Sequence, residues 1–435
     1  VQRADARRGL HAAGDQASVT TDRPVQRLGA GLAAAGVLLA SSSAAQVVTW
    51  RGSVEGRVTG FVQQAPNDPR QMIGDALWRH ETVVKPAAWL QVAAGLDGRL
   101  NTYDQVEREV RLDVRDRRAQ RPLLSLRRLS ATLTRGPWTV DVGKQFIRWG
   151  TADIVTPTDR FAPRDFLNVV EGQFLPVTGA RLVGEFASDR IDVAVVPWLT
   201  PSRAPLLTQR WTVVPPSGGP IAFTDVTGEP PTGAQVGARW VHRGAGYEFA
   251  GSVFDGFNTL PNVEVTPGDR PDRVLVRRIY PRIRTYGLDG ALPARWFTLK
   301  GEVAYFTSDT PATDEYALYV VEVERQTGEW LLLGGYAGEA VTVRRSERMF
   351  APDRGLTRAF VGRLSRTIDV NRSVAVETAV RQNGAGAFVR GEYSQARGAH
   401  WRTTVSLAWL GGASDDFLGQ YRRNSHASIT LRYSY

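Results

Sequence analysis

The feature that most constrains the fold is an alternation, with a period of two residues, of apolar or small side chains with polar ones. In residues 48–62, Val, Trp and Gly occupy the even positions and mostly Thr, Arg, Ser and Glu the odd ones, with Phe61 as the exception. Segments 90–100, 297–305, 387–394 and 401–409 repeat the pattern. Successive side chains of a β-strand point to opposite faces. The chain is therefore predicted to be all-β, with strands that each have one apolar and one polar face.

The connections between these segments alternate between short and long. The short ones fall near 135–137, 187–189, 243–246, 292–294, 326–329, 368–371 and 396–399. The long ones fall near 150–177, 200–232, 257–273, 343–354 and 411–419. This asymmetry is typical of an up-and-down antiparallel barrel of the outer-membrane kind. We expect about 18 strands, or 16 if residues 75–89 do not form a hairpin with its turn near Lys85 and Pro86.

Two readings of the alternation remain: a soluble β-sandwich with its apolar faces inside, or a transmembrane β-barrel with them outside. The apolar faces carry many Gly and Ala residues, which fill a core poorly but lie well against lipid. Charged residues avoid these faces in the clearest strands, as expected if a lipid-facing Arg or Lys costs about 2–4 kcal/mol at the bilayer centre. Aromatic residues gather near strand ends, as in the girdles of membrane barrels: Trp50, Trp89, Trp296, Tyr305, Trp401, Trp409, Tyr433 and Tyr435. The transmembrane barrel is the better interpretation.

The first 45 residues have the pattern of an export signal. Arg23 and Arg27 precede a short apolar run at 28–40, and small residues at 43–45 fit a cleavage site. We therefore expect an N-terminal extension and signal peptide at 1–45 and an outer-membrane barrel at 46–435.

The signal, the meander and the final "SITLRYSY" together resemble Gram-negative outer-membrane β-barrels of the porin type. The stretch "GKQFIRWGTADIVTPTDRFAPRDFLN" is also similar to a segment of porin-like and alginate-export-like barrels. The resemblance implies a place in the bacterial cell outer membrane, among membrane lipids and lipopolysaccharide. It also implies that Tyr433 and Tyr435 form the assembly signal read by the barrel-assembly machinery. Porin-like barrels are often trimers, so a homo-oligomer is compatible with the resemblance.

The polar strand faces would then line the interior of the barrel. A barrel of 16–18 strands leaves room for an aqueous channel, whose charged side chains set ion preference. The function indicated is passive diffusion of small polar or anionic solutes, because arginine predominates. The same charges could instead form cross-strand ion pairs that hold a closed, structural, adhesive or assembly-associated barrel. The predicted pore-lining residues are Arg51, Arg57, Arg99, Arg128, Arg239, Lys300, Arg363, Arg390, Arg402, Arg432, Glu55, Glu302 and Glu392.

Residues 150–176 are too long for a simple turn. If they fold inward they form a constriction, in which Arg160 and Arg164 would face Asp159 and Asp165, with Asp153 nearby. The alternative is a cap outside the pore. A second long loop, 200–232, is rich in Pro and Gly and is predicted to be an extracellular flap.

Catalytic and metal chemistry has little support in the sequence. The five histidines, His11, His80, His242, His400 and His426, form no metal-binding spacing, and the chain has no cysteine. An outer-membrane lipid-modifying enzyme would need a Ser–His pair that the sequence does not indicate. The net charge of +10 is spread along the chain without a basic block. We therefore expect no enzyme activity, metal, cofactor or nucleic-acid partner.

Overall fold

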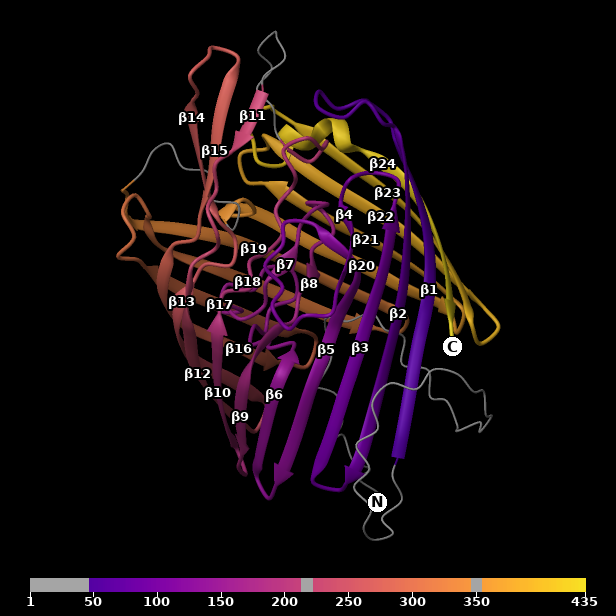
Figure 1. Ribbon diagram of the computed structural model, residues 1–435. Helices are drawn as coiled ribbons and strands as arrows, with labels where there is room; N and C mark the ends of the chain where they lie inside the picture. The colour runs from indigo at the N-terminus through magenta and orange to yellow at the C-terminus, as the bar shows by residue number, and fades with distance from the viewer. Residues whose placement is uncertain (1–46, 213–221, 346–353) are drawn as a thin grey trace. The chain divides into compact units, whose positions relative to one another are not determined.

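The computed structural model describes residues 47–212, 222–345 and 354–435, so the expected signal segment at 1–45 lies outside the described residues. Eighteen antiparallel strands form a closed barrel, as predicted (Figure 1). No helix in the described ranges is long and apolar enough to cross a bilayer. The barrel strands are β1 (Val47–Phe61), β2 (Met72–Ala87), β3 (Leu90–Asn101), β5 (Arg121–Arg135), β6 (Trp138–Gln145), β9 (Val177–Glu185), β10 (Asp189–Trp198), β12 (Thr232–Gly244), β13 (Tyr247–Phe257), β16 (Arg282–Pro293), β17 (Thr298–Thr307), β18 (Glu315–Thr327), β19 (Trp330–Val343), β20 (Ala359–Asp369), β21 (Arg372–Arg381), β22 (Gly386–Arg397), β23 (Trp401–Gly412) and β24 (His426–Ser434).

The barrel closes where the first strand meets the last. β1 pairs with β2 along one edge and with β24 along the other. Beyond β24, Gly52 and Tyr435 exchange two backbone hydrogen bonds of 3.0 Å each. Closure leaves the barrel sheet without a free edge. The unpaired backbone groups of a free edge would have no hydrogen-bond partners in a bilayer.

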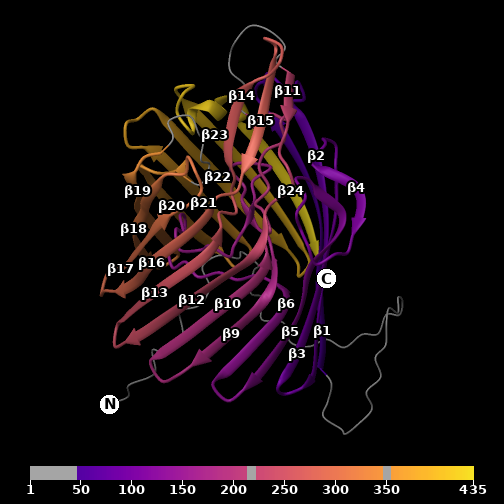
Figure 2. The same cartoon turned by 60° about the vertical axis from the view of Figure 1, so that its left-hand side comes forward.

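The smaller elements lie in the long connections. β4 (Val106–Arg111) pairs in parallel with β5, and β7 (Arg164–Asp165) pairs with β8 (Gln173–Phe174). β11 (Ala222–Asp225), β15 (Arg273–Ile279) and β14 (Asn262–Pro267) form a separate sheet that projects past the barrel strands (Figure 2). A 3-10 helix, η2 (Gly419–Asn424), precedes β24. The short turns and the long loops therefore occupy opposite ends of the barrel.

The two faces of the strands differ as the alternation predicted. On β1, Trp50, Val54 and Val58 are about half exposed, whereas Ser53 and Thr59 are buried. On β16, Tyr286 and Leu288 are exposed while Thr285 and Asp289 are buried. The apolar face therefore points outward and the polar face inward, the reverse of a soluble sandwich.

Two local details differ from the simplest pattern. The hairpin at 75–89 exists, but its turn lies at residues 88–89, because β2 continues through Lys85 and Pro86 to Ala87. In β6 the alternation fails after Val142 because Gly143 has φ +118°, and a Cβ there would lie 2.2 Å from the carbonyl oxygen of Leu129. Only glycine fits this position. The following Lys144 is 2% exposed.

Candidate functional site

The interior wall of the barrel carries most of the ionisable side chains. The predicted pore-lining residues all occupy inward-facing strand positions, as the pairing register and the burial pattern show. At the short-turn end, Arg51 is mostly exposed and pairs with Glu81, which also contacts Arg128. Other wall cations have acidic partners as well: Arg99 with Asp97, Arg239 with Asp289, Lys300 with Glu324, Arg363 with Glu377, and Arg390 with Glu392.

Arg402 and Arg432 differ from these cations. They lie directly opposite each other on β23 and β24. Arg402 donates a hydrogen bond of 3.1 Å to the hydroxyl of Ser394. Neither arginine forms an ion pair with any residue in the described part of the chain, although Glu55 lies opposite Arg432 on β1. This part of the wall therefore brings two positive charges and one negative charge together without an ion pair among them, and its net charge is positive.

Residues 146–176, here termed the interior segment, connect β6 to β9 and lie inside the barrel (Figure 1). Glu302 on β17 accepts backbone N–H bonds from Thr151 and Ala152 at 3.0 Å and from Thr158 at 2.7 Å. It also accepts the Thr158 hydroxyl at 2.8 Å. An irregular backbone inside a barrel cannot join the strand ladder, so its buried N–H groups need other acceptors. Glu302 supplies them.

The neighbouring strands complete this anchor. Glu322 on β18 accepts the backbone N–H of Asp153 at 2.8 Å and that of Ile154 at 3.2 Å. The ammonium of Lys300 bonds the Asp153 carboxylate at 2.6 Å. Asp289 on β16 accepts the Thr151 hydroxyl. The start of the segment is thus attached to three successive wall strands.

Apolar contacts hold the same region. Ile147, Trp149 and Phe161 are almost fully buried in a cluster with wall residues that include Phe254 and Phe306. The Phe161 ring meets Trp149 and Phe254 edge to face, each at a centroid distance of 5.0 Å. Such pairs add about 0.5–1.5 kcal/mol beyond the burial of their area. The segment is therefore packed against the wall as well as hydrogen-bonded to it.

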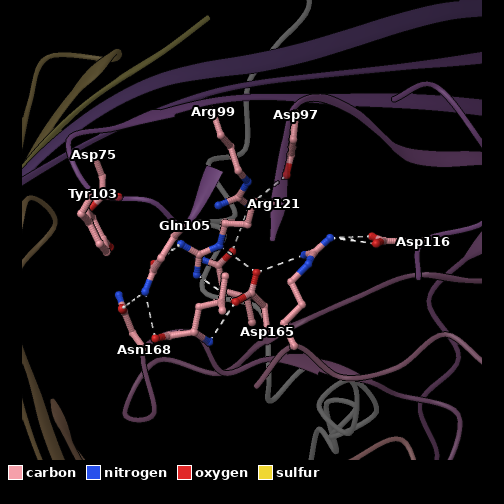
Figure 3. Close-up of polar contacts among 12 residues, drawn as sticks. Asp75, Asp97, Arg99, Tyr103, Gln105, Asp116, Arg121, Asp165 and Asn168 are labelled. Carbon is pink, nitrogen blue, oxygen red and sulfur yellow. Dashed lines mark hydrogen bonds and ion pairs between the residues drawn. The ribbon is translucent and has the colours of Figure 1, made fainter. Parts of the chain in front are cut away.

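The far side of the segment centres on Asp165 (Figure 3). Its carboxylate accepts two bonds from Arg121 on β5, at 2.8 and 2.9 Å, and one from Arg203 at 3.1 Å. Arg203 also binds Asp116 through two bonds of 2.8 and 2.9 Å. Burial opposes ionisation of Asp165, but the two guanidinium groups outweigh it and lower its pKa.

Three connections meet in this network, because Asp116, Asp165 and Arg203 come from the loops after β3, β6 and β10. Gln105 extends it by accepting a bond from Arg121 at 3.0 Å and donating to the carbonyl oxygen of Leu167 at 3.0 Å (Figure 3). Bidentate Arg–carboxylate pairs fix orientation as well as distance. The three loops are therefore held in one arrangement inside the barrel.

The tip of the segment reaches the first strand. Glu171 and Arg57 on β1 form two hydrogen bonds of 2.6 Å. Burial alone would raise the pKa of Glu171, but Arg57 lowers it from the usual 4.5 to about 2. Arg99 on β3 contacts Gln173 at 3.3 Å. The segment thus runs from the wall at β16–β18 to the wall at β1–β3.

The acidic residues predicted for the constriction have other ion-pair partners in the structure than Arg160 and Arg164. Asp165 pairs with Arg121 and Arg203 rather than with Arg160 or Arg164, because these two guanidiniums stack on Phe306 and Phe174. Asp159 lies 3.5 Å from Arg148, and its burial raises its pKa despite the nearby arginines. Asp153 pairs with Lys300 on the wall.

The prediction of an extracellular flap at 200–232 is wrong for its first part. Arg203, Gln209 and Trp211 are buried, and Arg203 exchanges backbone hydrogen bonds with Arg164 and Phe166. Residues 213–221 lie outside the described residues. Sequence reasoning also missed Asp116 and Gln105, since residues in loops carry no alternation that would mark them as interior, and it missed Arg121, which is the first residue of β5.

The four histidines in the described part of the chain lie apart from one another. His80, His242 and His400 contact aromatic rings near the short-turn end, and His426 is buried near Phe61 and Trp211. His242 and the Ser188 hydroxyl both bond the Asp189 carboxylate, at 3.0 Å each. The hydroxyl therefore donates to the acid and not to the imidazole.

Comparison with solved structures places this architecture among known folds. The crystal structure of Pseudomonas aeruginosa OpdQ matches with a TM-score of 0.52 at 10% sequence identity, covering 90% of this chain and 99% of that one. A BenF-like porin from Pseudomonas fluorescens Pf-5 matches with a TM-score of 0.52 at 10% identity, covering 90% and 98%. No protein-family model matches the sequence, and no curated protein matches it. The chain therefore has the fold of these outer-membrane porins.

Proposed function

We propose that this chain is a passive channel of the bacterial outer membrane for small polar or anionic solutes. One observation carries the proposal: a closed barrel with an apolar outer face has an inner wall on which Arg402 and Arg432 lack acidic partners within the described residues. An apolar exterior around a polar interior is stable only in a bilayer. Arginine on the inner wall attracts carboxylates and phosphates because its charge is permanent and its head is planar.

The interior segment is the proposed constriction. Its contacts with Glu302, Glu322 and Arg57 join wall strands on opposite sides of the barrel. Arg402 and Arg432 lie near the short turns, at the other end of β23 and β24 from the long loops. A solute would therefore meet the segment and the arginine pair in succession. The pore-lining residues predicted from the sequence would contribute the charges along this path.

The resemblance to porins also supports the proposed surroundings of the barrel. Membrane lipids and lipopolysaccharide would cover the exposed apolar residues of the outer face. Insertion would depend on the barrel-assembly machinery, with Tyr433 and Tyr435 as its signal, and a homo-oligomer is part of the same proposal.

The test is reconstitution in a planar bilayer, with single-channel conductance and the reversal potential measured in a potassium chloride gradient. We expect steady conductance and a reversal potential that shows chloride preference. A barrel that inserts but carries no current would contradict the channel, and potassium preference would contradict the anionic part of the proposal.

A second candidate is a structural barrel with a closed lumen. The network around Asp165 favours it, because that network fixes three loops inside the barrel. This candidate predicts heat-resistant β structure without ion flow, so the same bilayer measurement separates the two. We also propose that the barrel has no enzyme activity. Hydrolysis of phospholipid by the purified barrel would contradict this proposal.

A further inference from the structure

Two wall carboxylates bind the interior segment without a direct cationic partner. Glu302 and Glu322 are 3% and 0% exposed, and neither forms an ion pair with a described residue. Together they accept five backbone N–H groups, from Thr151, Ala152, Thr158, Asp153 and Ile154. An ionised carboxylate only accepts hydrogen bonds, and it has about four lone-pair sites. A side-chain amide would place its own N–H donors against some of these N–H groups.

We propose that Glu302 and Glu322 are positioning residues that hold the interior segment against the barrel wall. Protonating these two carboxylates releases the segment from the wall. A carboxyl group that takes up one proton turns an accepting oxygen into a donor, which then meets the segment N–H donors. At Glu302 this affects the bonds to Thr151, Ala152 and Thr158 together. The backbone N–H groups of residues 151–154 and 158 all bond to these two carboxylates. Residues 151–158 would therefore lose their attachment to the wall together.

The charged groups around the two carboxylates come from every neighbouring element. Asp289 on β16 lies opposite Glu302, and Arg239 on β12 pairs with Asp289. Lys300 lies opposite Glu322 and two positions before Glu302 on β17, but it is bonded to Asp153 and Glu324. Arg164 of the segment adds a more distant positive charge. Each of these cations lacks a direct bond to Glu302 or Glu322, so the segment N–H groups are the main hydrogen-bond donors to the two carboxylates.

The backbone at the anchor allows little adjustment. A Cβ at Gly150 would lie 2.7 Å from the Cβ of Thr156 and 3.3 Å from Oε1 of Glu302. Ala152 is 5% exposed and packs against Val320 and Ala337 of β18 and β19. A segment that fits this closely has a single position against the wall. If it loses its hydrogen bonds to Glu302 and Glu322, it leaves this position and does not shift slightly within it.

The first test uses conductance and so rests on the proposed channel function. Single-channel conductance is recorded from about pH 8 to about pH 3, a range that spans the titration of an ordinary glutamate. The wild type is expected to gain conductance and current noise on acidification. Glu302→Gln and Glu322→Gln should show that state already at neutral pH, with a flat profile. The matched control Glu377→Gln changes an inward-facing glutamate on β21 that pairs with Arg363, and it should keep the wild-type profile. Equal pH profiles in wild type and the Glu302 and Glu322 variants would overturn the proposal.

The second test does not need ion flow. The chain has no cysteine, so Ala152→Cys provides a single thiol on the seated segment. At a fixed neutral pH, labelling of the folded barrel by a small water-soluble maleimide should be slow. Adding Glu302→Gln should raise the labelling rate by about tenfold, because hydrogen bonds to a charged group are lost, whereas adding Glu377→Gln should not. Equal rates in all three backgrounds would overturn the proposal. If the wild type carries no current, the channel function fails, and the labelling result still decides the role of Glu302.

Discussion

The indole N–H of Trp78 on β2 donates a 2.9 Å hydrogen bond to the hydroxyl of Tyr435, across the intervening strand β1. The Tyr435 ring fits over Gly52, where a Cβ would lie 2.4 Å from the ring carbon Cζ. The imidazole of His80 stacks between Trp78 and Tyr435, at centroid distances of 6.1 and 6.2 Å. The seam where β1 meets β24 is therefore covered on its outer face by side chains from near both ends of the barrel sheet.

A side chain at Gly52 should open this seam. Gly52→Val would displace the Tyr435 ring and break its bond with Trp78, at an expected cost of about 1–3 kcal/mol from the lost ring contacts and hydrogen bond. The measurement is the temperature at which the folded barrel loses its compact migration on a gel. Gly56→Val is the matched control, because Gly56 shares the outer face of β1 and its Cβ would meet nothing within 4 Å. Equal losses in both variants would contradict the role of the seam.

Assembly should depend on the ring of Tyr435 more than on its hydroxyl. Tyr435→Ala removes both the ring and the bond to Trp78, whereas Tyr435→Phe removes only the bond. We expect the alanine variant to lower the yield of folded barrel in the outer membrane severalfold and the phenylalanine variant to lower it little. Yield is measured as the heat-modifiable fraction in isolated membranes. The assembly role would be wrong if the two variants gave the same yield as wild type.

The barrel wall could be predicted from the sequence because each strand repeats one rule. Alternation at 48–62 placed Ser53 and Thr59 inside and Val54 and Val58 outside, and the structure confirms this. The rule failed at Gly143, where a positive φ turns the strand and brings Lys144 inside. Periodicity reports the average path of a strand and not a single residue that departs from it.

The interior could be predicted only in part. The sequence indicated that residues 150–176 are too long for a turn but left an inward constriction and an outside cap as alternatives, and it indicated Lys300 and Glu302 because they lie on polar strand faces. It could not indicate that Asp165 would meet Arg121 and Arg203, which are 44 and 38 positions away in the chain. Contacts between loops depend on where several backbones cross, and no local pattern records that crossing.

The contact between Glu171 and Arg57 should make the fold sensitive to strong acid. The pKa of Glu171 is lowered in the folded barrel, so its stabilising effect is complete above about pH 4.5 and is lost as the pH falls toward 2. Across this range the wild type should lose up to about 3 kcal/mol more than Glu171→Gln, from a shift of about 2.5 units. Unfolding by denaturant at several pH values measures this. Glu109→Gln, at an exposed glutamate, should follow the wild type, and a Glu171→Gln curve parallel to wild type would contradict the prediction.

Removing the charge of Asp165 should loosen the three interior loops. Asp165→Asn leaves the buried guanidiniums of Arg121 and Arg203 short of a counter-charge, a change that typically costs about 3–5 kcal/mol. The barrel wall does not depend on this contact, so the strands should remain folded. Limited trypsin digestion of the folded barrel should then cut at Arg160 or Arg164, which wild type protects. Asp415→Asn, at an exposed aspartate of the last loop, serves as the control, and protection equal to wild type would show that the network is not needed.

The pair formed by Arg402 and Arg432 should set the ion preference of the channel. Two guanidiniums that face each other without an acidic partner raise the local concentration of anions, and this effect is strongest at low salt. The double variant Arg402→Gln/Arg432→Gln keeps a polar side chain at both positions and removes two positive charges. Its chloride-to-potassium permeability ratio should fall by about twofold, as measured from the reversal potential in a salt gradient. Arg397 lies at the short-turn end of β22, opposite Trp401, and faces the outside of the barrel. Arg397→Gln should therefore leave the permeability ratio unchanged. If Arg397→Gln lowered the ratio as much as the double variant, the preference would come from the overall charge of the barrel and not from this pair.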